Sequence, residues 1–271
     1  MPIEAVPAIQ PARLRQQSAL LAEHFDNPPA YVRSLHYLLD FYADRARRPS
    51  QAGKPGPLLE AYKVRPPVLR LILQELVPLA QQDPEKGFAL CDAFWKEPYL
   101  EFRMLAAMLL GQMPVETPEP ITQRIHDWIT TDLEMHLVDT ILTQGISRLR
   151  QERPLVLVDL IQDWLNNSKS FYQQLGLRAL LPLINDPGFE NLPAFFRMIQ
   201  PLTCNAPSAL RPDLLDVLTA LAHRSPQETA HFLRQCLTFP NASDTPWLVR
   251  QVLEEFPPEI QESLRQFMRK T

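Results

Sequence analysis

The sequence predicts an all-α fold, and three observations support this prediction. The chain of 271 residues contains 28 prolines but only 7 glycines. That ratio suits many short helices with a proline in the first turn, where the missing N–H costs no hydrogen bond. Apolar residues recur at intervals of three and four along most of the chain. No segment alternates as a half-buried strand does, because the runs "LVLV" and "LLPLI" continue into helical spacing.

Several helix starts can be read directly from the sequence. Ser225 precedes a proline and is followed three residues later by Glu228, which is the pattern of a capping box. Asp83 and Thr245 also stand before a proline, as N-cap residues do. From such signals and the apolar spacing we predict helices over residues 12–24, 29–47, 57–62, 66–81, 85–95, 98–112, 119–130, 132–150, 154–166, 170–184, 189–202, 208–223, 226–238, 246–256 and 258–269.

Helix pairs of about 40 residues recur, as in 170–202 and 208–238, which is the period of HEAT-like arrays. Such pairs bury their apolar faces against neighbouring pairs, so we expect a right-handed superhelical solenoid with one concave side. Within it, the small side chains of Ala106 and Ala107 should let a neighbouring helix approach closely. The Pro- and Gly-bearing loop at 48–57 suggests an N-terminal helical cap over 1–50 and one continuous array over 51–271.

The composition narrows the class of protein. The chain is 45% hydrophobic and 21% charged, as is normal for a globular protein. Its net charge of −4 does not indicate nucleic-acid binding. No apolar run is long enough for a membrane span, and no signal pattern opens the chain, so we expect a cytoplasmic protein without a membrane partner. The three cysteines, Cys91, Cys204 and Cys236, are far apart and expected to be reduced and buried. Neither a metal site nor another cofactor is expected.

One carboxylate stands in an apolar run. Asp139 lies in "DLEMHLVDTILTQG", between the pairs "LV" and "IL". An ionised aspartate in a core is costly unless it has a partner. We consider two roles for Asp139: chemistry on a bound partner, or an ion pair with an arginine of the next repeat, such as Arg178, which we favour.

Basic residues gather early in the chain. Residues 33–70 hold eight basic and three acidic side chains, whereas residues 101–200 hold eight basic and twelve acidic ones. The early segment, which includes Lys63 and Arg65, can grip a phosphate backbone or form a solvated loop flank, and the second reading is favoured. Arg148 and Arg150 follow Asp139; they either face a groove or end a helix, where cations suit the dipole.

Five motifs, in order, resemble those of the DNA alkylation repair family of HEAT-like glycosylases. They cover about residues 60–235 and read "AYKVRPPVLRLILQEL", "FWKEPYLEFRMLAAMLLG", "DLEMHLVDTI", "DWLNNSKSFYQQLGLRALLPLI" and "RPDLLDVLTALAHRSPQETAHFL". The resemblance implies duplex DNA in a concave groove and removal of cationic N3- or N7-alkylated purines. It also places Asp139 on the family's catalytic aspartate and Arg178 on the arginine of the fourth motif.

The aromatic residues of the family's site are replaced in this chain. Met135 stands where the family has an aromatic residue four positions before the aspartate, and the second position falls near Asp216 or Val217. The sequence therefore leaves two functions open. One is a DNA-binding repair protein, with or without weak glycosylase activity, in which Asp139 stabilises a cationic sugar. In this function Arg178, Arg148, Arg150, Lys63 and Arg65 contact DNA. The other is a non-catalytic scaffold whose concave face binds a protein partner.

Overall fold

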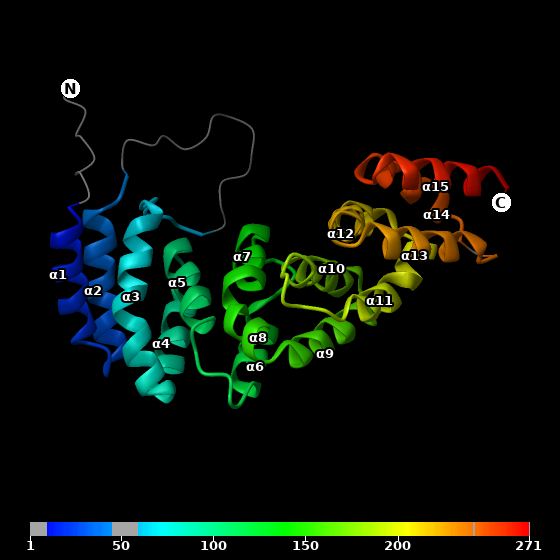
Figure 1. The fold of residues 1–271 in the computed structure, drawn as a ribbon. Coiled ribbons are helices and arrows are strands. Elements are labelled where there is room, and N and C mark those ends of the chain that lie inside the picture. The colour runs from blue at the N-terminus through cyan, green and yellow to red at the C-terminus, as the bar shows by residue number, and fades with distance from the viewer. Residues whose placement is uncertain (1–9, 45–58, 241, 271) are drawn as a thin grey trace, which may run out of the picture. The chain divides into compact units, whose positions relative to one another are not determined.

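The structure, a computed structural model, describes residues 10–44, 59–240 and 242–270. These residues form α-helices with one π-helical and two short 3-10 segments, and they contain no strand; one isolated parallel bridge joins Glu60 and Tyr99 (Figure 1). The predicted all-α class is confirmed. Among the described helices, none combines the length and the apolar character that crossing a bilayer requires.

The chain divides into two compact units, Met1–Pro154 and Leu155–Thr271. In the first unit, α1, α3, α5 and α7 pack side by side in one layer, and α2 and α4 form the other. Arg124 of α6 joins this second layer through hydrogen bonds of 2.8 and 2.7 Å to Asp92 of α4. The elements are α1 Pro11–Ala22, α2 Pro28–Phe41, α3 Pro66–Gln82, α4 Pro84–Lys96, α5 Leu100–Leu110, α6 Glu119–Trp128, α7 Met135–Thr140, the π-helical η1 Ile141–Gly145 and α8 Ser147–Glu152.

The second unit repeats the two-layer plan. Helices α10, α12 and α14 pack side by side, and α11, α13 and α15 form the other layer. The elements are α9 Pro154–Leu165, which starts at the boundary between the units, α10 Ser170–Ile184, α11 Leu192–Cys204, η2 Ser208–Leu210, α12 Arg211–Arg224, α13 Pro226–Thr238, α14 Thr245–Val252, η3 Leu253–Glu255 and α15 Pro258–Lys270.

Each unit has its own aromatic core. In the first, Phe94 lies between Tyr31 and Phe102, with ring centroids 5.5 and 5.9 Å apart, and all three side chains are fully buried. In the second, Phe195 stacks on Phe189 at 4.8 Å. Full burial of an aromatic side chain of this size contributes roughly 1.5–3 kcal/mol. The first cluster, whose rings come from α2, α4 and α5, therefore holds the two layers of its unit together.

Proline marks the helix starts as predicted, but the caps differ in detail. Asp83 accepts a hydrogen bond from the Lys86 N–H at 3.2 Å, as an N-cap should. Ser225 occupies the N-cap of α13, yet its side chain accepts no capping hydrogen bond. Thr245 is the first residue of α14 rather than its cap, because its hydroxyl donates to the Thr203 carbonyl at 3.0 Å.

Three predicted helices require correction. The helix predicted at 57–62 is absent from its described part, since residue 59 is a bend and residue 60 forms the bridge to Tyr99. The helix predicted at 29–47 ends at Phe41, and that predicted at 132–150 is divided into α7, the π-helical segment and α8. The loop at 48–57 and the boundary between 1–50 and 51–271 lie outside the described residues.

Candidate nucleic-acid interface

Asp139 is exposed, although apolar residues surround it in the sequence. Leu137, Val138 and Ile141 are fully buried, whereas the Asp139 side chain faces solvent. Helical rotation of about 100° per residue explains this, because it turns Asp139 away from the side that its neighbours bury. The burial that the apolar run indicates is therefore not observed for Asp139.

The helix that carries Asp139 is seated firmly on α5. The π-helical segment after it is closed by the Ile146 N–H, which donates to the Ile141 carbonyl at 3.1 Å. A Cβ on Gly111 would lie only 1.7 Å from the Gln144 carbonyl oxygen, so no side chain fits at the end of α5. A Cβ on Gly145 would lie 3.4 Å from the Ala107 carbonyl oxygen, so this part of the π-helical segment lies beside α5. π-Helical turns often mark functional sites.

Lys63 and Arg65 belong to an extended segment that leads into α3. Lys63 has φ of 58°, a left-handed conformation that costs a non-glycine residue roughly 1–2 kcal/mol. The buried Glu101 carboxylate compensates, because it accepts hydrogen bonds from the N–H groups of Tyr62 at 3.1 Å and Lys63 at 2.6 Å. Strained backbone held in this way is often found at functional positions. Glu101 thus has a structural role within its motif.

A cavity of about 330 Å³ connects this segment with the π-helical turn. Lys63 lines it from the extended segment and Arg70 from α3. Met104 and Met108 line it from α5, and Gln144 from the π-helical segment. The cavity therefore brings a predicted DNA-binding lysine and a second cation, Arg70, next to the element that continues α7.

Arg148 and Arg150 lie in α8, within the first unit. The Arg148 Nε is 2.5 Å from Glu152 Oε1, and its Nη1 donates to the Gln112 carbonyl at 3.3 Å. The first contact lies within α8, and the second attaches α8 to the chain just after α5. Arg150 is half-buried in the last turn of α8, where a cation suits the helix dipole. Contact of either arginine with DNA stays a prediction.

Arg178 lies in the second unit, in the layer formed by α10, α12 and α14. Its Nε is 2.7 Å from Oδ1 of Asp213, whose side chain is only 5% exposed. Gln174 donates to Oδ2 of the same carboxylate at 2.7 Å. Asp213 was not predicted from the sequence, although a charged residue among apolar ones, here Leu210 and Leu214, indicates a buried ion pair. Pairing of Arg178 with Asp139, and contact with phosphate, stay predictions.

No aromatic side chain stands at either position that the resemblance aligns with the aromatic residues of the family's site. Met135, four residues before Asp139 in α7, is 37% exposed. Asp216 is exposed and Val217 is fully buried. Trp128 does not substitute, since it is buried and stacked on Trp95 with ring centroids 4.4 Å apart.

A polar aromatic cluster in the first unit was also missed. The His36 Nδ1 lies 2.7 Å from the Tyr62 hydroxyl, and its Nε2 lies 3.1 Å from Glu97 Oε2. The rings of Tyr62 and Tyr99 stack at 4.8 Å. Burial, together with the neighbouring Tyr99, raises the pKa of the Tyr62 hydroxyl above its ordinary value. The cluster fixes the segment that carries Lys63; no sequence signal predicts it, because its members are 26 and 61 residues apart.

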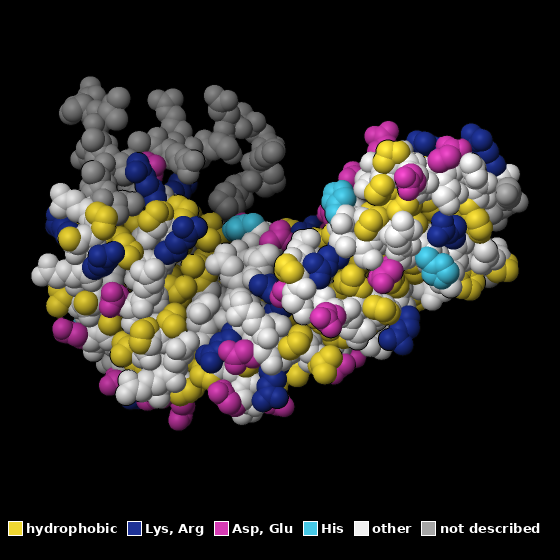
Figure 2. All heavy atoms as spheres, viewed as in Figure 1, with side chains coloured by type: hydrophobic (Ala, Val, Ile, Leu, Met, Phe, Trp, Pro, Cys, Tyr) yellow, Lys and Arg dark blue, Asp and Glu magenta, His cyan; other side chains and the backbone are white. Residues whose placement is uncertain are grey.

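Positive charge is not concentrated on the face drawn in Figure 2. There the Lys and Arg side chains stand singly among acidic and apolar ones. Within the described residues, no group of three His, Cys, Asp or Glu side chains could hold a metal ion. The cysteines are free: Cys91 and Cys236 are buried as predicted, and Cys204 is half-buried.

Helix pairs stacked in two layers define an α-helical repeat protein. The sequence model of the DNA alkylation repair enzyme family matches residues 46–256. This is well over half of the chain, so the chain belongs to the DNA alkylation repair enzyme family. No curated protein and no solved structure matches it.

Proposed function

We propose that this protein binds duplex DNA along the layer that contains α3, α5 and α7 and removes cationic N3- or N7-alkylated purines. The observation that carries the proposal is Asp139, an exposed carboxylate on an otherwise buried turn, seated rigidly by the π-helical segment. Membership of a DNA repair family supports it. Lys63, Arg65 and Arg70 are the cations suited to phosphate in the neighbouring segment.

The proposed reaction requires few catalytic groups from the protein. An alkylated purine already carries a positive charge and takes the electron pair of the glycosidic bond as that bond breaks. The sugar then becomes oxocarbenium-like, and a carboxylate beside it stabilises the developing charge. Water adds its oxygen to C1′ of the sugar and releases a proton, so the products are a neutral base and an abasic site. Asp139 acts here as an electrostatic stabiliser.

Replacing Asp139 with asparagine tests this role. The substitution keeps the size of the side chain and removes its charge, so release of 7-methylguanine and 3-methyladenine from methylated duplex DNA should fall roughly a hundredfold. Asp163→Asn, a change at an exposed position of α9, is the matched control. Equal release by wild type and the Asp139 variant would remove Asp139 from the mechanism.

The missing aromatic walls favour a slow enzyme. A cationic base is attracted to the face of an aromatic ring, and Met135 offers none. Since Met135 and Asp139 are four apart in α7, a tryptophan at 135 would lie on the same side of the helix as the carboxylate. Met135→Trp should therefore raise the release of alkylated base, and should do so only while Asp139 is present.

The second candidate function is a non-catalytic scaffold that binds a protein partner on its concave face. The replacement of both aromatic positions and the net charge of −4 favour it. Retention on a duplex DNA column separates the two functions, because phosphate contacts give a steep salt dependence. No retention at about 50 mM salt would support the scaffold, since nonspecific DNA binding is strongest at low salt.

A further inference from the structure

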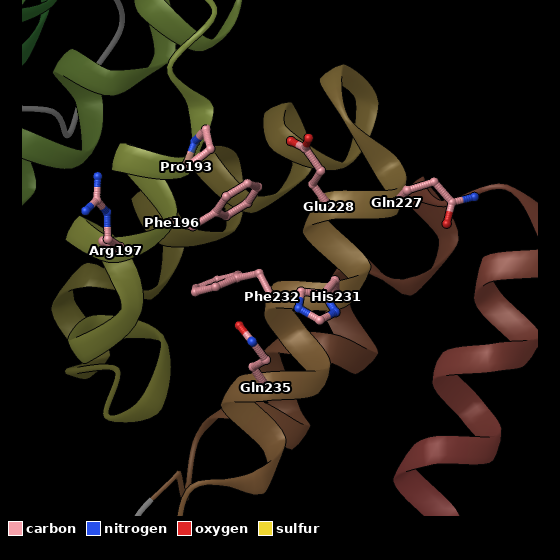
Figure 3. Close-up of a pocket in the computed structure, with 8 residues that line it drawn as sticks. All are labelled: Pro193, Phe196, Arg197, Gln227, Glu228, His231, Phe232 and Gln235. Atoms are coloured by element: carbon pink, nitrogen blue, oxygen red, sulfur yellow. The ribbon is translucent and has the colours of Figure 1, made fainter.

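The second unit contains a groove that the proposed function does not use. It lies between α11 and α13 and encloses about 500 Å³, a size typical of small-ligand sites. These helices belong to the layer that does not contain Arg178. Its lining consists of Pro193, Phe196, Arg197, Gln227, Glu228, His231, Phe232 and Gln235 (Figure 3).

The floor of the groove is aromatic. Phe196 and Phe232 point toward each other from the two helices in Figure 3, with ring centroids 5.0 Å apart and ring planes at 33°. Phe232 is buried, but Phe196 is only half-buried. The groove therefore presents ring surface that a flat apolar ligand can cover, which is a favourable arrangement for stacking.

The rim is polar, and its side chains make no contacts of their own. Arg197, Glu228 and His231 are exposed, and none of them forms an ion pair or side-chain hydrogen bond with another described residue. Some charged side chains of the same unit are paired, as Arg211 is with Asp244 at 2.7 Å. The rim thus keeps its hydrogen-bonding capacity for a ligand.

The aromatic floor and the polar rim together indicate the chemistry of the ligand. An aromatic floor suits a flat ring, and the Glu228 carboxylate and the glutamine amides suit a ring edge that has both donors and acceptors. Arg197, on the opposite wall, is a planar donor that matches phosphate. The charges of Arg197 and Glu228 cancel, so a purely cationic or purely anionic ligand is not favoured.

We propose that the groove between α11 and α13 binds a nucleotide unit, with its base over Phe196 and Phe232 and its phosphate on Arg197. Base stacking on aromatic side chains is favourable and tolerant of sequence. The unit can come from a free mononucleotide or from the end of a single strand, and both share this chemistry.

Calorimetry on the full chain tests the proposal, with deoxyadenosine monophosphate, deoxyadenosine and inorganic phosphate as probes. The monophosphate should bind with saturation at or below about 1 mM, the range of modest affinities. Phosphate alone should not bind. Arg197→Gln should weaken the monophosphate about tenfold and leave deoxyadenosine unchanged, because one charged contact is lost. Arg250→Gln, at an exposed position of α14, is the matched control and should change neither ligand.

Phe196→Leu isolates the stacking part of the proposal. It keeps an apolar side chain at a half-buried position, so the unit should still fold, and both ligands should weaken about tenfold. A short single-stranded oligonucleotide that binds more tightly than the monophosphate identifies a strand end as the source; equal affinity identifies the free nucleotide. Absence of saturable binding, or equal effects of Arg197→Gln and Arg250→Gln, would overturn the proposal whether or not Asp139 is catalytic.

Discussion

At the residue scale, a buried side chain that bonds to backbone N–H groups fixes the geometry of the candidate nucleic-acid interface. Glu101 is 3% exposed and accepts two N–H groups of the segment before α3, which fixes the left-handed backbone of Lys63. The motif that contains Glu101 therefore acts as a clamp: it holds the backbone of the basic segment before α3 in place. Glu101 is 38 and 39 residues away from the two N–H groups in sequence, so no local pattern predicts these partners.

Glu101→Gln tests the clamp. An amide offers one oxygen and one donor group where two N–H groups need acceptors, so a buried N–H is left unpaired. We expect the free energy of unfolding to fall by about 1–3 kcal/mol, measured by urea denaturation. Glu116→Gln, at an exposed loop position, should leave it unchanged. Equal stability of the two variants would mean that Glu101 does not hold this segment.

Sequence reasoning located single residues better than their partners. The position of Asp139 in its motif singled it out, but the apolar run around it indicated burial, and helical rotation puts it in solvent. Asp213 and His36 were missed because their contacts depend on tertiary packing. Arg178 lies 35 residues from Asp213 in sequence, and no local pattern predicts that the two are 2.7 Å apart.

Helix starts were the most predictable feature at the scale of the element, because proline and cap residues act locally. Helices α3, α4, α10 and α13 begin within a residue of the predicted positions. The division of 132–150 could not be predicted, since it arises where Gln144 meets Gly111 across two elements. Local propensity continues through this region, and tertiary packing interrupts it.

The cap of α4 gives a pH-dependent prediction. Asp83 accepts the Lys86 N–H, and its carboxylate lies 3.1 Å from Lys86 Nζ. The Lys86 side chain and N–H together lower the pKa of Asp83 below its ordinary value. A carboxyl group with a lowered pKa in the folded state stabilises the fold above its ordinary pKa, and this stabilisation is lost as the pH falls through the folded value.

Asp83→Asn should therefore be less stable than wild type near neutral pH, and the difference should shrink below about pH 4, where the wild-type carboxyl becomes protonated. Asparagine keeps the capping oxygen, so the comparison isolates the charge. Asp83→Ala should be less stable than Asp83→Asn at every pH, because it also loses the cap. Thermal unfolding followed by circular dichroism gives both comparisons, and a difference independent of pH would contradict the role of the charge.

At the scale of the whole molecule, the fold class followed from composition and apolar spacing, whereas the division into two units did not. The boundary predicted between residues 50 and 51 lies outside the described residues and stays a prediction, and compact packing also changes at Pro154, at the first residue of a helix. Proline there belongs to a helix start like many others in the chain, so no signal distinguishes it. Each unit buries its own aromatic cluster, and stability in helical arrays is a sum of local terms rather than one global quantity.

The two units should for this reason unfold in separable steps, and buried thiols can report each step. Cys91 is fully buried in the first unit and Cys236 in the second, where burial raises the pKa of the Cys236 thiol to about 12. A protected thiol reacts only after its own unit opens. In a Cys204→Ser background each unit holds one cysteine, so alkylation at increasing urea, read by mass spectrometry, follows the units independently. We expect two midpoints. A single midpoint for both cysteines would show that the 271 residues unfold as one cooperative body, and that packing between the units contributes as much to stability as the cores within them.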